Sequence, residues 1–230
     1  MSQPVAIVTG AGRGIGRAVA IQLSALKYDL VLVSRTASEL EATRRQCVPE
    51  AAVMPADVSS AQQVDDLVLR AREKFKRIDV LVHCAGVALA RRADQMTQEE
   101  WRATIDTNLS AVFYFSRLLW PIWKSQGGGV MVNVSSLAGR DPFEGLGAYG
   151  AAKAGVNLLG VALAREGKSE NIRVHTVAPG ATDTVMFRSL VGPEFPQDRI
   201  LDPADVARVI VQCVRGDLVN TSGEVIYVHK

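Results

Sequence analysis

The clearest indication of the fold is the segment Val5-Ala-Ile-Val-Thr-Gly-Ala-Gly-Arg-Gly-Ile-Gly16. Its first five residues form an apolar run of strand length, and the glycines that follow stand at positions 10, 12, 14 and 16. Glycines at this spacing allow a sharp turn and let backbone N–H groups approach a negatively charged ligand closely. A strand, a glycine-rich turn and a helix start in this order are typical of the first βα unit of a dinucleotide-binding domain.

Six further apolar runs of strand length follow, and segments with helical periodicity alternate with them. None of the runs alternates strictly between polar and apolar residues, which suits strands buried on both faces. The repeated strand–helix order predicts a doubly wound α/β fold, in which one parallel seven-stranded sheet is flanked by helices and residues 1–230 form a single domain. We expect strands at 5–9, 30–33, 51–54, 80–83, 130–134, 174–178 and 225–228, and helices near 14–27, 37–47, 62–76, 98–124, 148–167 and 203–215.

The bulk composition excludes several classes of protein. The chain has 230 residues, of which 48% are hydrophobic, and its net charge of +2 comes from scattered basic residues, so we expect no nucleic-acid partner. The apolar segment 111–123 is too short to span a bilayer, and we expect no membrane partner. Three widely spaced cysteines predict neither a metal site nor a disulfide framework, and the first residues show no signal-peptide pattern. These observations favour a cytoplasmic protein.

The glycine turn and the end of the second expected strand indicate which dinucleotide is bound. We expect the pyrophosphate to lie against Gly10, Gly12, Arg13, Gly14, Ile15 and Gly16. An NAD site usually carries an acid at the end of the second strand, whereas this chain has Ser34-Arg35-Thr36 and no acid from Leu30 to Ser38. Arg35, helped by Arg13, can grip a 2′-phosphate, so the pattern favours NADP(H). The alternative is that both arginines are solvated surface residues.

Tyr149 and Lys153 are four residues apart in an expected helix and therefore share one face. A tyrosine hydroxyl ordinarily titrates near pH ~10, and a neighbouring ammonium group favours the phenolate and so makes proton transfer more effective. Alone, such a pair is usually a surface pair. Here it follows both a nucleotide-binding turn and the serines Ser135 and Ser136 at the end of a strand, which favours a catalytic pair.

Together these motifs resemble the short-chain dehydrogenase/reductase family, from about Val5 to Val228. The resemblance implies a Rossmann fold, a nicotinamide cofactor and hydride transfer between that cofactor and a carbonyl or alcohol carbon. The matching pieces are TGAGRGIG at 9–16, Asp57-Val58, Asn108, NVSSLAG at 133–139, YGAAK at 149–153 and PGATDT at 179–184.

The resemblance also assigns roles to individual residues. Ser136, the second of the paired serines, matches the residue that orients the substrate carbonyl, and Tyr149 matches the proton donor. Lys153 matches the residue that bonds the nicotinamide ribose and lowers the tyrosine pKa, and Asn108 matches the residue that holds a relay water. On its own, Asn108 would be better explained as a polar residue that bonds a neighbouring helix. The expected cofactor contacts beyond the glycine turn are Ser34, Arg35, Asp57, Val58, Ala85, Gly86, Tyr149, Lys153, Pro179, Gly180, Thr182 and Thr184.

One motif departs from the family pattern. The family usually has Asn-Asn-Ala-Gly after the fourth strand, and this chain has His83-Cys84-Ala85-Gly86. The backbone contacts of Ala85 and Gly86 to the cofactor can persist, but the side-chain bonds that steady the sheet must differ. We expect Cys84 to be a small apolar filler and His83 a core histidine without a catalytic role.

The substrate is less clearly indicated. Residues 184–202, which include Met186 and Phe187, are expected to form a lid, and Phe143 and Leu146 suggest a partly apolar pocket. Arg91, Arg92 and Arg188 can favour an anionic or acyl-carrier-linked substrate, but solvated surface arginines are the better explanation. The favoured function is reduction of ketones by a carbonyl reductase of broad or small-ketone type, with reduction of 3-oxoacyl thioesters second. A non-catalytic NADPH sensor is the alternative from another class. Resemblance implies a homotetramer or dimer formed by the helices near 98–124 and 148–167, although Trp120, Trp123, Leu158 and Leu159 could equally be intrachain core.

Overall fold

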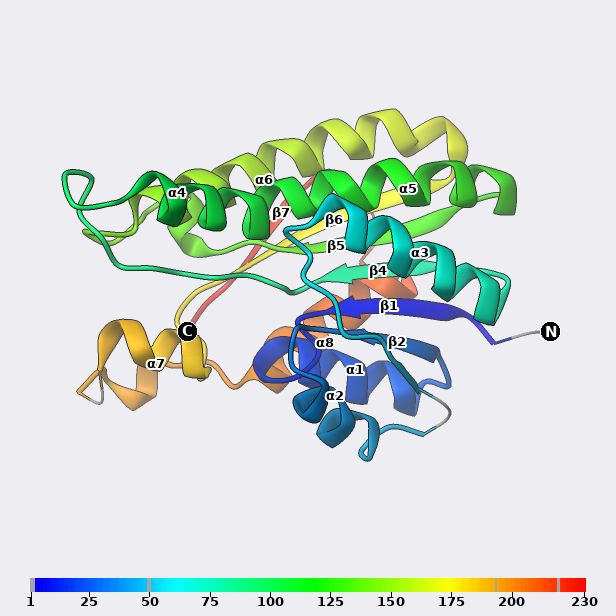
Figure 1. Ribbon diagram of the computed structural model, residues 1–230, viewed down its shortest axis with the longest axis horizontal. Coiled ribbons are helices and arrows are strands. Elements are labelled where there is room, and N and C mark those ends of the chain that lie inside the picture. Colours follow the sequence, from blue (N-terminus) through cyan, green and yellow to red (C-terminus); the bar gives the residue numbers. More distant parts are fainter. Residues whose placement is uncertain (1–2, 49–50, 193, 219) are drawn as a thin grey trace.

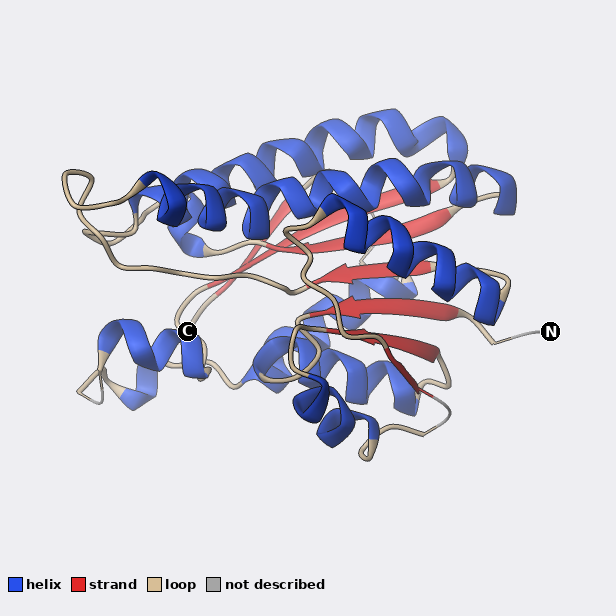
Figure 2. Cartoon of the chain, in the orientation of Figure 1, coloured by secondary structure: helices blue, strands red, loops and turns tan. Residues whose placement is uncertain are grey.

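The computed structural model describes residues 3–48, 51–192, 194–218 and 220–230. Seven strands form one parallel sheet with the order β3-β2-β1-β4-β5-β6-β7 (Figures 1 and 2). The prediction of a doubly wound Rossmann sheet is therefore confirmed. The strands are β1 Val5–Thr9, β2 Asp29–Val33, β3 Ala51–Val53, β4 Val80–His83, β5 Gly129–Val134, β6 Ile172–Pro179 and β7 Val225–Val228.

Helices cover both faces of the sheet, as Figure 1 shows. One face carries α3, α5 and α6, and the other carries α1, α2 and α8. The α-helices are α1 Gly14–Ala25, α2 Ala37–Arg44, α3 Ala61–Phe75, α4 Gln98–Ile105, α5 Ala111–Gln126, α6 Gly147–Gly167, α7 Val185–Val191 and α8 Pro203–Arg215. Among the described residues, no helix is both long and apolar enough to cross a membrane.

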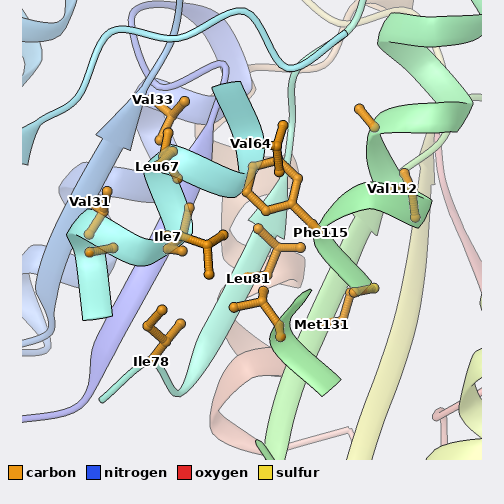
Figure 3. Packing of buried hydrophobic residues seen from close by; sticks show 14 of the residues in the cluster. Ile7, Val31, Val33, Val64, Leu67, Ile78, Leu81, Val112, Phe115 and Met131 are labelled. Atoms are coloured by element: carbon orange, nitrogen blue, oxygen red, sulfur yellow. The ribbon is translucent and has the colours of Figure 1, made fainter. Parts of the chain in front are cut away.

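Two hydrophobic cores lie on the two faces of the sheet, because side chains along a strand point alternately to opposite faces. Ile7 of β1 packs into the core beneath α3 and α5, with Leu81, Phe115 and Met131 (Figure 3). Its neighbour Val8 packs into the core beneath α1 and α8. Burial on both faces explains why the strands read as continuous apolar runs rather than alternating ones.

Local signals set the helix ends. Ser60 accepts a hydrogen bond from the backbone N–H of Gln63 at the start of α3, and Thr97 forms a capping box with Glu100 at the start of α4. Asp202 caps α8, whose first residue is Pro203. Such polar caps satisfy N–H groups that the first turn leaves without intrahelical partners.

The long helix expected near 98–124 is interrupted. The residues Asp106–Ser110 form a π-helical turn between α4 and α5. The segments on both sides of a π-turn keep helical periodicity and the extra residue only shifts its phase, so the sequence pattern predicts one long helix here. The expected lid segment also contains a helix that the sequence did not indicate, α7, together with a short 3₁₀ turn at Gln197–Arg199.

The carboxyl ends of all seven strands lie at one edge of the sheet, and β1 and β4 are neighbours there. After β1 the chain runs towards β2 and β3, whereas after β4 it runs towards β5, β6 and β7. Loops that leave in opposite directions open a crevice at this switch point, which is where open α/β sheets bind ligands. The fold therefore places the glycine turn at the expected binding crevice.

Packing at the amino end of β5 gives a test of the core. Trp123 is fully buried, its indole N–H donates to the Ile78 carbonyl over 3.0 Å, and a Cβ at Gly129 would overlap the indole ring. We predict that Gly129→Ala lowers the free energy of unfolding by about 1–3 kcal/mol, measured by urea denaturation, because the core cannot take the added methyl group.

Gly147→Ala is the matched control. Gly147 opens α6, is exposed, and has open space where a Cβ would lie. Its replacement should leave stability unchanged or slightly raise it, because alanine favours helix. Equal stability of the two variants would contradict the proposed packing.

Candidate active site

A cavity of about 290 Å³ runs along the carboxyl edge of the sheet. It brings together residues from every strand–helix junction between β1 and α7 and includes all the site residues expected from the sequence except Asn108. The expected residues that line it are Gly10, Gly12, Arg13, Gly14, Ile15, Gly16, Ser34, Arg35, Asp57, Val58, Ala85, Gly86, Ser136, Tyr149, Lys153, Pro179, Gly180, Thr182 and Thr184.

The glycine turn after β1 needs its glycines for two physical reasons. Gly10 and Gly14 have φ values of +64° and +53°, in the left-handed region that side chains disfavour. A Cβ at Gly10 would also come within 2.9 Å of the Ala85 backbone nitrogen, in the loop after β4. The turn can therefore lie directly against the neighbouring loop only with glycine at this position.

The first turn of α1 is suited to an anion. Arg13, the N-cap residue, makes no capping hydrogen bond with its side chain, and no acidic residue lies in the first turn. The N–H groups at a helix start carry partial positive charge and are free to face a ligand. With glycines below and the helix start beside it, this part of the cavity fits the pyrophosphate of a dinucleotide.

The adenosine end of the cavity carries both arginines that the sequence indicated, together with an acid that it did not. Ser34, Arg35 and Thr36 line the cavity after β2. Glu39, in the first turn of α2, also lines it, and one of its carboxylate oxygens lies 3.8 Å from Arg13 Nη1. The segment from Leu30 to Ser38 carries no acid, but this end of the cavity does. The first turn of α2 brings Glu39, the residue after Ser38, back over the glycine turn.

Asp57 and Val58 line the cavity after β3. Asp57 Oδ1 accepts hydrogen bonds from the Ser59 backbone N–H and hydroxyl, at 2.9 and 2.7 Å. Burial acts to raise the pKa of Asp57, but these hydrogen bonds and the charge of Arg35 hold that pKa below its ordinary value. Asp57 is therefore an ionised hydrogen-bond acceptor at neutral pH.

Ser136, Tyr149 and Lys153 meet at the other end of the cavity. Tyr149 and Lys153 lie on α6, and Lys153 Nζ lies 5.6 Å from the centroid of the Tyr149 ring. Lys153 is almost fully buried and donates to the Val134 carbonyl at the end of β5 over 2.9 Å. This places a tyrosine hydroxyl, a serine hydroxyl and an ammonium group around one open space.

Burial changes the pKa values of these groups. It raises the pKa of Tyr149, against the lowering effect of a hydrogen bond with Ser136. It lowers the pKa of Lys153 to about 8. The pKa of Tyr149 therefore lies above its ordinary value, and the lowering effect that the resemblance assigns to Lys153 stays a prediction. Tyr149 is a protonated phenol at neutral pH and can act as a proton donor.

Asn108 lies outside the cavity. It is fully buried in the π-turn, and its amide donates to the carbonyls of Val87 and Thr104, both over 2.8 Å. Its Oδ1 accepts from the Val87 N–H over 3.3 Å and would lie 2.7 Å from a Cβ at Gly86. The side chain therefore joins the π-turn to the loop after β4, and the relay role stays a prediction.

His83 and Cys84 stand where the family has two asparagines. His83 is buried, and its Nδ1 lies 3.2 Å from the hydroxyl oxygen of Thr9. The same oxygen accepts a hydrogen bond from the Ala85 N–H over 3.0 Å. Burial, helped by the charge of Lys153, lowers the pKa of His83 to about 3. Burial raises the pKa of the half-buried Cys84 thiol to about 12. A neutral imidazole and a protonated thiol fit the expected core roles.

Beyond Tyr149 the lining of the cavity is mostly apolar, and Asp141 is a charged residue in it. It is bounded there by the loop after β4, the segment before α6, and α7 with its flanking residues. Residues 184–187, 190 and 191 of the expected lid line this end, so the lid segment does border the site. The apolar side chains here are Val87, Ala88, Leu137, Phe143, Leu146, Val185, Met186, Phe187, Leu190 and Val191.

Two residues that the sequence did not indicate, Arg17 and Thr43, form hydrogen bonds with the backbone of the glycine turn. Arg17 donates to the Gly12 carbonyl and, over 3.1 Å, to the hydroxyl of Thr43 on α2. The buried Thr43 hydroxyl lies 2.9 Å from the Ala11 carbonyl and 3.2 Å from the Glu39 carbonyl. Neither contact leaves a local sequence signal, because each joins α2 to a residue more than 25 positions earlier, Arg17 on α1 or Ala11 in the glycine turn.

Comparison with known proteins agrees with this geometry. The family model described as short chain dehydrogenase matches residues 4–194. An acetoacetyl-CoA reductase of Rhizobium meliloti is 35% identical over 215 residues, covering 90% of this chain and 89% of the relative. An uncharacterised oxidoreductase of Staphylococcus epidermidis is 30% identical over 211 residues, covering 92% and 90%. The crystal structure of levodione reductase matches with a TM-score of 0.93 at 28% identity, covering all of this chain and 97% of the other.

The burial of Lys153 predicts a pH dependence of stability. Its pKa is about 8 in the folded protein and ordinarily 10.5, so the unfolded chain binds more protons between these values. Stability should therefore rise as the pH increases from about 8 to 10.5. We compare the free energy of unfolding of the wild type with that of Lys153→Met at each pH. We predict that this difference changes by roughly 3 kcal/mol in favour of the wild type over this range.

Denaturation with urea at a series of pH values measures this difference. Lys168→Met is the matched control, because Lys168 is exposed and its loss should leave the pH dependence of the wild type unchanged. If the free energies of unfolding of the wild type and Lys153→Met changed equally with pH, burial would not lower the pKa of Lys153.

Proposed function

The chain belongs to the short-chain dehydrogenase/reductase family, and from this premise we propose that it is an NADP(H)-dependent carbonyl reductase acting on uncharged, largely apolar ketones. The observation that carries the proposal is the apolar end of the cavity, which adjoins the hydroxyls of Tyr149 and Ser136. An apolar wall favours substrates without charge, because burying an unpaired charge there is costly.

The nearby arginines also favour an uncharged substrate. Arg91, Arg92 and Arg188 are the arginines that could attract an anionic substrate, and none of them lines the cavity. Each is instead paired with a carboxylate: Arg91 with Glu100 at 3.2 Å, Arg92 with Glu144 at 2.9 Å and Arg188 with Asp183 at 2.8 Å.

The proposed mechanism assigns a task to each side chain. A bound nicotinamide supplies the hydride for reduction. Ser136 and Tyr149 hold the carbonyl oxygen of the substrate and stabilise the negative charge that develops on it. Tyr149 then donates its phenolic proton to that oxygen, which its raised pKa permits at neutral pH. The ammonium group of Lys153 stabilises the resulting phenolate.

The preference for NADP(H) rests on the two arginines at the adenosine end. Arg13 and Arg35 both line the cavity, and the chain directly after β2 carries no acid. Two guanidinium groups favour a 2′-phosphate over a 2′-hydroxyl. Glu39 opposes this preference with one negative charge.

Reduction of a 3-oxoacyl thioester is the second candidate. It is favoured by the 35% identity with the acetoacetyl-CoA reductase of Rhizobium meliloti. The paired arginines weaken it, because they offer no free positive charge to an anionic carrier group. A sensor that binds NADPH without turnover remains the alternative from another class, and the catalytic side chains at the cavity weigh against it.

The proposed enzyme also fits a reducing cytoplasm and a homo-oligomer. All three cysteines are free. Trp123 is part of the intrachain core, and Trp120 and Leu159 pack partly against that core. Leu158 on α6 and Phe113 on α5 are instead 73% and 52% exposed. Exposed apolar side chains of this size on helices of the proposed contact suit burial against a second copy.

Oxidation of NADPH and of NADH, followed by the loss of nicotinamide absorbance, tests the proposed reaction. The carbonyl panel contains aliphatic and aromatic ketones, small dicarbonyls and a 3-oxoacyl thioester. We predict the fastest turnover with NADPH and an uncharged ketone. Tyr149→Phe should lower kcat by a factor of about 10²–10⁴ while leaving NADPH binding nearly unchanged, because only the proton donor is lost.

Each other outcome has a definite meaning. Preference for the thioester would support the second candidate, and NADPH binding without turnover on any carbonyl would support the sensor. Comparable turnover by Tyr149→Phe would contradict the assigned proton donor.

Analytical ultracentrifugation tests the oligomer. We predict that the wild type sediments as a dimer or tetramer and that Leu158→Glu shifts it towards the monomer, because a buried unpaired carboxylate is costly. Leu69→Glu is the matched control on α3, where Leu69 is 58% exposed outside the proposed contact. A monomeric wild type would contradict the proposal.

A further inference from the structure

Glu39 lies where the adenosine ribose of a dinucleotide would be bound. A Cβ at Gly12 would come within 2.9 Å of both the Cβ and Oε2 of Glu39, and within 3.2 Å of the Ser34 hydroxyl. The carboxylate therefore lies directly on the glycine turn. It lines the same cavity as Arg13 and Arg35.

Hydrogen bonds between α2 and the glycine turn fix the position of Glu39. The Thr43 hydroxyl lies between the carbonyls of Glu39 and Ala11, and Arg17 joins the same hydroxyl to Gly12. These bonds attach α2 to the glycine turn. These backbone contacts, and not only the conformation of the Glu39 side chain, therefore set the distance between its carboxylate and the cofactor site.

The charges at this end of the cavity oppose one another. Glu39 Oε1 lies 3.8 Å from Arg13 Nη1, and both side chains are partly exposed, so this ion pair adds little stability. It nevertheless engages one of the two guanidinium groups available to a 2′-phosphate. A 2′-phosphate bound here would be attracted by Arg13 and Arg35 and repelled by the Glu39 carboxylate, and the ionised Asp57 near Arg35 lines the same cavity.

A second acid on the same helix, which lies outside its first turn, provides a comparison for Glu39. An acid in the first turn of a helix is favourable because of the helix dipole, wherever it points. Glu41, also on α2, is partly exposed, pairs with Arg44 at 2.7 Å and does not line the cavity. Glu39 differs because it faces the cavity and contacts the glycine turn.

We propose that Glu39 sets the selectivity between NADPH and NADH. This inference rests on the proposed use of a nicotinamide dinucleotide and adds a residue that limits the preference for NADPH. When the cofactor carries a 2′-hydroxyl, the carboxylate accepts hydrogen bonds from the ribose hydroxyls. When the cofactor carries a 2′-phosphate, the carboxylate repels it and competes for Arg13. The protein therefore binds NADH as well as NADPH.

Dissociation constants for NADPH and NADH, measured by isothermal titration calorimetry without substrate, test the proposal. The variants are Glu39→Gln, which removes the charge and keeps the size, and Glu41→Gln as the matched control. We expect Glu39→Gln to bind NADPH more tightly and NADH no more tightly, so that the ratio of the two constants shifts about tenfold towards NADPH. Glu41→Gln should keep the ratio of the wild type.

The outcomes separate this inference from the proposed function. An unchanged ratio in Glu39→Gln, or an equal shift in Glu41→Gln, would overturn the role of Glu39 whichever cofactor the wild type prefers. Tighter binding of NADH than of NADPH by the wild type would contradict the proposed NADPH preference. If Glu39→Gln still shifted the ratio towards NADPH, the role of Glu39 would nonetheless be supported.

Discussion

The contact on which the rest of the structure depends is that between the glycine turn after β1 and the loop after β4. Gly10 can lie against the backbone of Cys84 and Ala85 only because it has no side chain. The Thr9 hydroxyl completes the junction by accepting from the Ala85 N–H and contacting His83. The junction lies at the switch point of the sheet, so it sets the position of the adenosine end of the cavity relative to its catalytic end.

The two ends of that cavity use burial and charge differently. At the catalytic end, burial keeps Tyr149 protonated and lowers the pKa of Lys153, so the ammonium group is retained at a cost in stability. At the adenosine end, Arg13 and Glu39 are partly exposed, and their charges act on a ligand more than on the fold. Selectivity can therefore be altered at the adenosine end with little effect on folding.

The sequence was informative where a residue acts through its own backbone or its near neighbours. Positive φ angles at Gly10 and Gly14 follow from the glycine pattern, and the shared face of Tyr149 and Lys153 follows from helical spacing. It was uninformative about the π-turn at Asp106–Ser110, because the segments on both sides of that turn keep helical periodicity. The bonds of Asn108 to Val87 and of Arg17 to Thr43 depend on segments about 20 to 26 residues away, and no local pattern marks them.

By itself, then, the sequence determined the family, the doubly wound sheet and the residues gathered along its carboxyl edge, because periodicity and the glycine motif are local properties. Only the tertiary structure decided which charges meet a ligand. It turned Glu39 back over Gly12, paired Arg91, Arg92 and Arg188 with acids away from the cavity, and buried the Asn108 side chain outside it. Electrostatic interactions depend on distance in space, and a spacing along the chain does not specify that distance.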